Sequence, residues 1–326
     1  FNKGVINMNN LKKIGLSALA GSLVATSAFA GEVTVAGSAS MGLEHINGGA
    51  ANSGKSFSMG NQLTFSGGGE LENGLDVSIS FVLDQGDGVT ASTAPFDSHS
   101  VSVGSDSMGT VTMHGEGGSS AAGAVDGSTS GGIWDLFMAA ADEPDAAAGA
   151  GGMLVYSLPS MVDDLAVVAS YSPKGTGFAS STSYSVVYSG VEGLTLTYAQ
   201  GSDNASGTSE ANQTVMAINY AFGPLTVGYS NSEYDDELAA GDEELIGYSL
   251  AYTVNDNISV SLGSEELSRG VVTGTNVAFE GEKANITYTA GGMTLGATMA
   301  SGDNISYSTA ATEDRSVWAL SASFAF

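Results

Sequence analysis

The sequence predicts an all-β protein, a 16-stranded antiparallel transmembrane β-barrel, and three observations lead to this fold class. Apolar and small polar residues alternate in segment after segment of the chain. Short and long connections between these segments follow one another in turn. The chain also closes on an alternating strand, residues 316–326, that ends with an aromatic residue. Strands of roughly ten alternating residues, joined in this way, are long enough to cross a lipid bilayer.

The N-terminal segment is expected to lie outside the barrel. A short region with Lys12 and Lys13 precedes the apolar residues 14–25, and Ala28-Phe29-Ala30 fits the small residues of a cleavage site. The apolar stretch is shorter than the roughly 20 residues that a membrane-spanning helix needs. We therefore interpret residues 8–30 as a signal peptide for export, residues 1–7 as a spurious upstream extension, and residues 31–326 as one β-barrel domain.

Sixteen segments carry the alternation. In one of them, Val77, Ile79 and Phe81 occupy one parity while Ser78 and Ser80 occupy the other. Because successive side chains of a strand point to opposite sides of the sheet, each segment has one apolar face and one polar face. In chain order the predicted strands are residues 33–43, 57–65, 75–83, 98–103, 110–116, 153–158, 165–171, 184–188, 194–198, 215–222, 225–229, 245–254, 258–262, 283–289, 293–299 and 316–326.

The polar parity distinguishes a membrane barrel from a soluble sandwich, which would show the same alternation. It consists mainly of Ser, Thr, Gly and acidic residues, and not of the mixture of Lys and Glu that covers a soluble surface. The apolar parity is therefore expected to face lipid, and the small parity to face the interior. In the last strand this places Trp318, Leu320 and Phe324 outside, and Val317 and Ser321 inside.

The connections fall into two groups that alternate along the chain. One group is short and rich in Gly and Asn, which supply the positive φ angles of tight hairpins. The other group is longer and acidic. Short turns on one rim and long loops on the other are typical of outer-membrane barrels, which predicts a location in the bacterial outer membrane. The long connections are residues 84–97, 117–152, 172–183, 201–212, 230–244, 264–282 and 301–315.

The charge and motif content exclude several classes of ligand and reaction. With 8 Lys and Arg against 35 Asp and Glu, the chain has no basic cluster for nucleic-acid phosphates. It has no Cys, no His pair at zinc spacing, and no nucleotide-binding or nucleophile motif, so we expect no enzyme activity and no required cofactor. The acidity itself has two interpretations, a cation-selective interior or adaptation to a saline habitat.

The connection of residues 117–152 is the longest. A barrel of sixteen strands is wide enough to enclose a water-filled channel, and long irregular segments within a compact domain are usually functional. The most apolar part of this loop, residues 133–138, is followed by Asp142, Glu143 and Asp145. We expect the loop to fold into the channel, with its apolar part on the inner wall and its carboxylates toward the opening. The alternative is a flap that packs over the rim or over a neighbouring subunit.

The opening residues 31–35, the sixteen alternating segments, the long third loop after the fifth strand and the terminal Phe326 resemble the trimeric general porins of alphaproteobacteria, the Rhodobacter type. The resemblance covers residues 31–326 and rests on pattern and order more than on a long motif. It implies a homotrimer surrounded by outer-membrane lipid and lipopolysaccharide. It also implies that acids on the third loop face Arg and Lys on the opposite wall across a constriction.

On the acidic side, the resemblance implies Asp126, Asp135, Asp142, Glu143 and Asp145 on the loop, with Glu116 at its mouth. Few basic residues are available for the opposite wall. Related porins commonly place Arg in the early strands, where this chain has the uncharged residues 58–62. By parity, Lys283 and Arg315 are the cations expected on the channel wall.

The acidic loops also raise the question of calcium, which takes about six to eight oxygen ligands from carboxylates and carbonyls. The candidate ligands are Asp84, Asp87, Asp142, Glu143 and Asp145. None of them has the spacing of a dedicated calcium loop, so a solvated acidic loop is the alternative interpretation.

These observations predict an outer-membrane general diffusion porin, a channel for the passive transport of ions and small hydrophilic solutes. Acidic linings favour cations, so we expect cation preference. Two alternatives stay open. One is a substrate-specific channel in which Trp134 and Phe137 form a stacking surface for sugars, and the other is a secreted acidic β-rich structural or adhesive protein.

Overall fold

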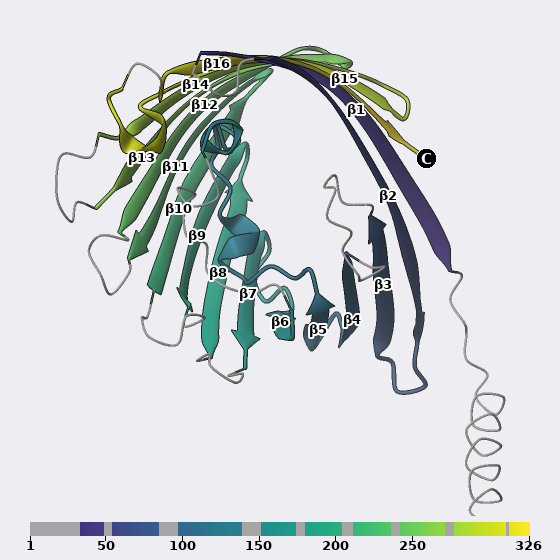
Figure 1. Ribbon diagram of the computed structural model, residues 1–326. Coiled ribbons are helices and arrows are strands. Elements are labelled where there is room, and N and C mark those ends of the chain that lie inside the picture. Colours follow the sequence, from purple (N-terminus) through teal and green to yellow (C-terminus); the bar gives the residue numbers. More distant parts are fainter. Residues whose placement is uncertain are drawn as a thin grey trace, which may run out of the picture.

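The computed structural model describes residues 33–48, 54–84, 97–138, 151–173, 180–203, 211–235, 242–270, 277–310 and 313–326. These residues form one closed barrel of sixteen antiparallel strands, which confirms the predicted fold class (Figure 1). Each strand pairs with its neighbours in the chain. The ring closes where β1 (Thr34–Gly48) pairs with β16 (Arg315–Ala325).

The remaining strands follow in chain order, and each corresponds to a segment that the alternation predicted. They are β2 (Gly54–Glu70), β3 (Asp76–Asp84), β4 (Ser98–Ser105), β5 (Gly109–Glu116), β6 (Met153–Ser157), β7 (Leu165–Ser172), β8 (Ser181–Val191), β9 (Leu194–Asp203), β10 (Ala211–Phe222), β11 (Leu225–Asp235), β12 (Glu243–Asn255), β13 (Ile258–Arg269), β14 (Phe279–Ala290) and β15 (Met293–Asp303). The described residues also contain three short 3-10 helices, η1 (Gly123–Val125), η2 (Trp134–Leu136) and η3 (Ile305–Tyr307). Among the helices of the described ranges, none has the length and apolar character needed to span a membrane.

Several strands run further toward the long loops than their alternation predicted. β11 continues past Tyr229 to Asp235, and β13 continues past Leu262 to Arg269. On these extensions the outward positions carry polar residues such as Glu233. The hydrogen-bond ladder therefore continues beyond the part of the wall that needs an apolar outer face, and alternation alone underestimates the length of the strands.

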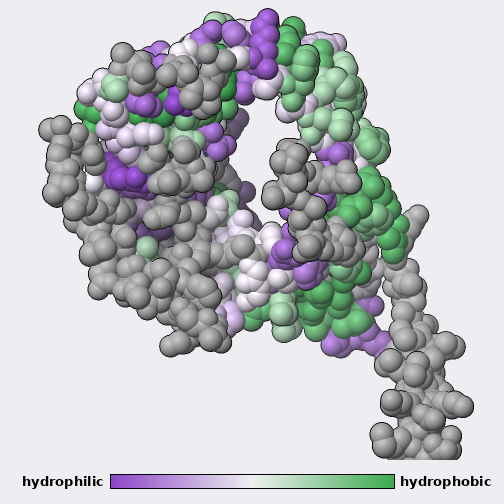
Figure 2. Space-filling view, in the orientation of Figure 1, coloured by the Kyte–Doolittle hydropathy of each residue, from purple (hydrophilic) through white to green (hydrophobic). Residues whose placement is uncertain are grey.

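The two parities face as predicted. Leu320 is 50% exposed on the outer side of β16, whereas Val317, on the opposite parity, is only 6% exposed. On the outer side of β11 and β12, the rings of Tyr229 and Tyr248 lie with their centroids 5.3 Å apart. Figure 2 shows hydrophobic residues along the outer side of the molecule and an opening through its middle that is bordered in part by hydrophilic residues. We call the parity opposite to the exposed apolar residues the inner wall.

The C-terminal residue takes part in closing the barrel. The backbone N–H of Gly37 donates to the carbonyl of Phe326 at 2.7 Å, and the N–H of Phe326 donates to the carbonyl of Gly37 at 2.9 Å. The ring of Phe326 lies where a side chain at position 37 would have to be. A glycine in β1 therefore makes room for the terminal ring beside it.

Candidate functional site

The described part of the long loop, residues 117–138, begins with a segment tied to the inner wall by serine hydroxyls. The backbone N–H of Ala121 donates to Oγ of Ser170 at 3.0 Å, and that of Ala122 donates to Oγ of Ser183 at 3.1 Å. The Oγ atoms of these two serines, on β7 and β8, lie 2.7 Å apart. Two loop amides that have no partner in a ladder thus receive acceptors from the wall, as buried backbone donors require.

Asp126 is the next point of attachment. Its carboxylate accepts hydrogen bonds from the hydroxyl of Ser232 at 2.7 Å, from the hydroxyl of Tyr234 at 2.6 Å and from the side-chain amide of Gln213. Burial raises the pKa of the Asp126 carboxyl above its ordinary value, while the three hydrogen bonds act in the opposite direction. The Asp126 carboxylate is therefore bound by side chains of the wall strands β10 and β11.

A second carboxylate, supplied by the wall, binds the loop further along. Glu265 on β13 is 2% exposed, and its Oε1 accepts from the hydroxyl of Ser130 at 2.7 Å while its Oε2 accepts from the backbone N–H of Trp134 at 2.8 Å. Between these two points, Nζ of Lys283 donates to the carbonyl of Gly131 at 2.6 Å. Charge-assisted hydrogen bonds of this kind are stronger and more directional than neutral ones.

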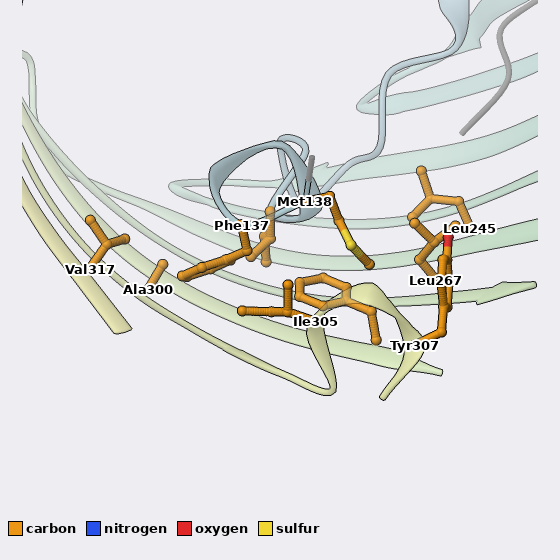
Figure 3. Packing of buried hydrophobic residues seen from close by; sticks show 10 residues of the cluster. Phe137, Met138, Leu245, Leu267, Ala300, Ile305, Tyr307 and Val317 are labelled. Carbon is orange, nitrogen blue, oxygen red and sulfur yellow. The ribbon is translucent and has the colours of Figure 1, made fainter. Parts of the chain in front are cut away.

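Three apolar residues of the described part of the loop pack against the wall. Ile133, Phe137 and Met138 enter a buried cluster. Figure 3 shows Phe137 and Met138 within it. The rings of Phe137 and Phe279 have centroids 6.2 Å apart, and Trp134 packs against the same cluster. From the wall and from the segment after β15 the cluster contains Leu245, Leu267, Phe279, Ala300, Ile305, Tyr307 and Val317.

The acids expected at the constriction have different positions. Glu116, at the end of β5, and Asp135, within η2, are exposed, whereas Asp126 is held by the wall. Asp142, Glu143 and Asp145 lie outside the described residues. Glu116 and Asp135 are therefore the two acids of the expected set that are open to solvent within the described ranges.

The two expected wall cations both have partners. Lys283 holds the loop carbonyl of Gly131, and a guanidinium nitrogen of Arg315 lies 3.6 Å from Oε2 of Glu313. A third cation, Arg269, shares the inner parity of β13 with Glu265. It lies 2.6 Å from Oε1 of Glu243 and 4.6 Å from the centroid of the Tyr307 ring.

Sequence reasoning missed the residues on the wall that hold the loop. Glu265 and Arg269 fall within residues 264–282, which were interpreted as a loop because the outer alternation ends near Leu262. The inner parity continues there as Gly263, Glu265 and Leu267. The signal in the sequence was a carboxylate, Glu265, on the inner parity between Gly263 and Leu267. Alternation alone does not show which residues contact that carboxylate in the folded barrel.

The inner wall of β1 to β5 has a different character. Its side chains are mostly hydroxyls, and Oγ of Ser102 lies 2.8 Å from Oγ1 of Thr112. Ser56, Ser58 and Ser78 are exposed. A pocket of about 560 Å³ opens at the turn end of this wall, lined in part by Asp76, Ser78, Ser102, Asp106 and Ser157.

The calcium candidates are largely outside the described residues, which include only Asp84 of the set. Asp84 is exposed at the end of β3. Within the described ranges, no three or more His, Asp or Glu side chains gather as a metal site would require.

A known protein family and several solved structures match this chain. The family model described as Gram-negative porin matches residues 15–281. A mutant of the Rh. blastica porin is similar with a TM-score of 0.66 and 13% identity, over 90% of this chain and 100% of that chain. A loop-deletion mutant of OmpT, an outer membrane protein of Vibrio cholerae, gives a TM-score of 0.65 and 16% identity, over 91% and 99%. An anion-selective porin from Comamonas acidovorans gives 0.65 and 15%, over 90% and 99%.

No curated protein matches the chain in sequence. At identities this low, the solved structures show the shared barrel fold, while the family match extends over most of the chain. The closed sixteen-stranded ring, the apolar outer face and the hydroxyl-rich inner wall agree with that match. The chain belongs to the Gram-negative porin family and is an outer-membrane general diffusion porin.

Proposed function

We propose that this porin prefers cations and that the whole loop of residues 117–152 folds into the channel as its constriction. The observation that carries the proposal is the state of the charges on the inner side. Arg269, Lys283 and Arg315 each lie beside a carboxylate or hold a loop carbonyl, whereas Glu116 and Asp135 are exposed. Exposed carboxylates act on passing ions, while cations that are paired with a carboxylate or held by the loop oppose them less.

The shared fold does not decide the sign of the selectivity, because one structure of the same fold is described as anion-selective. Reconstituted channels in a KCl gradient supply the test. A reversal potential on the cation side is expected, and it should weaken at high salt because salt screens the exposed carboxylates. A reversal potential on the anion side would contradict cation preference. Deletion of residues 131–145 should raise the conductance, and an unchanged conductance would contradict the role of the loop.

We further propose the Rhodobacter-type trimeric subgroup for this chain. The order of elements supports it, since the long loop follows β5. The outer face near the closure also supports a homotrimer. Phe57 and Met59 on β2 are 87% and 70% exposed, and Met41 on β1 is 59% exposed. Mass measurement in detergent should give three copies, and replacement of Phe57 by Asp should yield monomers.

Lipopolysaccharide and its divalent cations are proposed as partners of the outer rim. Acids lie directly opposite one another on the outward parity of neighbouring strands, with Glu233 across from Glu244, and Glu280 across from both Glu266 and Asp303. Like charges in such pairs repel, and a bridging cation would relieve this repulsion. Chelation by EDTA should lower the melting temperature in lipopolysaccharide-containing membranes. An unchanged melting temperature would contradict the proposal.

Calcium in the long loops is a separate proposal, with Asp84 and Asp87 as ligands from one loop and Asp142, Glu143 and Asp145 from another. The strong negative charge of the chain supports it. Calcium added to lipopolysaccharide-free protein should raise the melting temperature, and Asp84→Asn should reduce that rise. Apart from calcium, we propose that the porin needs no cofactor and catalyses no reaction.

The export signal is also proposed, with cleavage after residue 30, and the N-terminal sequence of the mature protein tests it. The sugar-specific alternative has no support from Phe137, whose ring is 6% exposed within the cluster and is not open to a solute. The soluble adhesive alternative does not account for the many exposed large apolar side chains on the outer face, such as Tyr248 and Leu262.

A further inference from the structure

One cross-strand row on the inner wall alternates between residues that bond the loop and residues that make room for it. In register, Ser230 on β11 pairs with Gly247 on β12, and Gly247 pairs with Glu265 on β13. Glu265 pairs with Gly281 on β14, and Gly281 pairs with Gly302 on β15. The row crosses five consecutive strands, so it forms a single straight feature of the wall. We call these five residues the loop seat.

The glycines of the loop seat are filled by loop atoms. A Cβ on Gly281 would lie 2.7 Å from Cγ2 of Ile133, and a Cβ on Gly302 would lie 2.8 Å from Cδ2 of Phe137. A Cβ on Gly247 would collide with Oγ of Ser128. Separations under 3 Å require something to move, so each glycine marks a place where the loop backbone or side chain lies directly on the strand.

The other two members of the loop seat are the anchors. Oγ of Ser230 accepts from the backbone N–H of Thr129 at 3.0 Å. Glu265 accepts from Ser130 and from Trp134, one with each oxygen. Beside the seat, Lys283 holds the carbonyl of Gly131 at 2.6 Å, and Gly263 leaves room for Ser130. Glu265 thus binds two separate loop residues, one through each carboxylate oxygen.

Apolar packing and hydrogen bonds contribute differently to this attachment. Packing in the cluster around Phe279 is strong but non-directional, so it keeps the loop on the wall without defining its exact height or angle. The Glu265 carboxylate is directional, and both of its oxygens are used by the loop. Without it, the part-buried N–H of Trp134 and the buried hydroxyl of Ser130 would lose their acceptor, which favours a different position of residues 130–134.

We propose that Glu265 is the positioning residue of the constriction: it sets the place of the loop on the glycine-lined seat, and through it the conductance and ion selectivity of the channel. This inference rests on the proposed function, because the loop must border the conducting path for its position to matter. Lys283 has a supporting part, since its bond to Gly131 fixes the short segment between the two points that Glu265 holds.

The main variant is Glu265→Gln, which keeps the size of the side chain and removes its charge. The amide keeps a single acceptor oxygen, so both charge-assisted bonds become weaker neutral ones and the bond to Ser130 must reverse its direction. The matched control is Glu282→Gln, because Glu282 lies on the neighbouring strand β14, carries the same charge and is exposed on the outer side. Conductance, current fluctuation and reversal potential are measured for both variants in planar bilayers, after gel mobility has shown that each barrel is folded.

A reversible disulfide between the loop and the wall tests whether holding the loop in place restores the properties of the channel. The chain has no cysteine, and a Cβ on Gly263 would lie 3.1 Å from Cβ of Ser130, close to the spacing of about 3.5–4.5 Å found in disulfides. The pair Ser130→Cys and Gly263→Cys is combined with Glu265→Gln. Oxidation should return the conductance and selectivity of the variant to the wild-type values, and reduction should remove the rescue.

Glu265→Gln is expected to give a higher and fluctuating conductance with weaker ion selectivity, and Glu282→Gln the wild-type values. Should Glu265→Gln fail to fold, Gly281→Val offers a second variant, because a β-branched residue suits a strand but displaces Ile133. Its control is Gly67→Val on β2, where a Cβ would meet only ordinary contacts of 3.5 Å and 3.8 Å. Wild-type conductance in the folded seat variants, or failure of the cysteine pair to cross-link, would overturn the proposal. Cross-linking without any channel activity of the parent protein would instead contradict the proposed function.

Discussion

The inner wall of this barrel has two regions built from the same kinds of residue but used in opposite ways. On β2 and β3, Ser58 and Ser78 are exposed to the interior. On β7, β8 and β11, Ser170, Ser183 and Ser230 are 8%, 6% and 2% exposed, and each accepts a hydrogen bond from a backbone amide of the loop. A serine on the inner parity can therefore face water or accept a hydrogen bond from the loop. Its position relative to the loop, not its identity, decides which.

The two regions also differ in how they handle charge. On the loop-bound wall, Glu265 and Lys283 hold the loop, Arg269 lies beside Glu243, and Asp126 is bound by three donors. On the open wall, Asp76 and Asp84 are exposed. Charges on the first wall thus stabilise structure, while exposed charges on the second act on ions that pass. Variants on the two walls should separate these two uses of charge and hydroxyl groups.

Replacement of Phe279 by Ala should have the largest effect on stability. This ring is fully buried in the cluster under the loop, and loss of a buried Phe costs about 3–5 kcal/mol through lost burial and the cavity left behind. Phe222→Ala is the matched control, because Phe222, at the end of β10, is 73% exposed. Unfolding in urea, followed by tryptophan fluorescence in detergent, measures both. Equal losses in the two variants would contradict the difference between the regions.

The double change of Ser170 and Ser183 to Ala should have the next largest effect. The amides of Ala121 and Ala122 would lose their acceptors in a buried place, at a cost of about 1–3 kcal/mol for each unsatisfied group. The same change at Ser56 and Ser58 on the open wall should cost little, since water replaces those hydroxyls. Thermal unfolding by circular dichroism compares the two double variants. A loss at the open wall that matches the loss at the loop-bound wall would be evidence against the comparison.

Neutralising exposed acids should change selectivity without changing stability. Glu116→Gln combined with Asp135→Asn is expected to move the cation-to-anion permeability ratio toward one, because these exposed carboxylates act on ions through water. Asp126→Asn should leave the ratio closer to the wild-type value, since its carboxylate is committed to Ser232 and Tyr234. Reversal potentials at low salt measure the difference. A larger shift from Asp126→Asn than from the exposed pair would reverse the assignment.

The smallest expected effect is a dependence of loop attachment on pH. Burial raises the pKa of Asp126 in the folded protein above its value in the unfolded chain. Its contribution to stability is therefore fully present below the unfolded pKa, and it is lost as the pH rises through the folded pKa. Melting temperatures at pH 7 and pH 4 should show a relative gain at low pH that Asp126→Asn lacks. An identical pH profile in the variant would contradict this role of Asp126.

Much of the fold could be predicted because the alternation of apolar and small residues is a local property. Every strand was found from it, and the parity of Val317 and Leu320 gave the correct sides. The ends of strands toward the long loops were less predictable, because at Glu233 and Glu266 the outer face no longer meets the apolar band. Of the apolar stretch 133–138, Ile133, Phe137 and Met138 enter the buried cluster, whereas Leu136 is 40% exposed.

The attachment of the loop could not be predicted, because it joins residues far apart in the chain. Thr129 meets Ser230, and Ser130 meets Glu265, only after the ring of strands has closed. The expected roles of Lys283 and Arg315 depended on parity alone, and parity does not show that Lys283 binds a loop carbonyl or that Arg315 lies beside Glu313.

The sequence by itself determined that this chain is a sixteen-stranded barrel, which face of each strand meets lipid, and that one loop is long and partly apolar. These are consequences of a two-residue period and of the spacing between turns, both of which are written along the chain. Only the tertiary structure decided which polar residues line water and which hold the loop. The register of five strands had to bring Ser230, Gly247, Glu265, Gly281 and Gly302 into one row before the loop had a surface that could receive it.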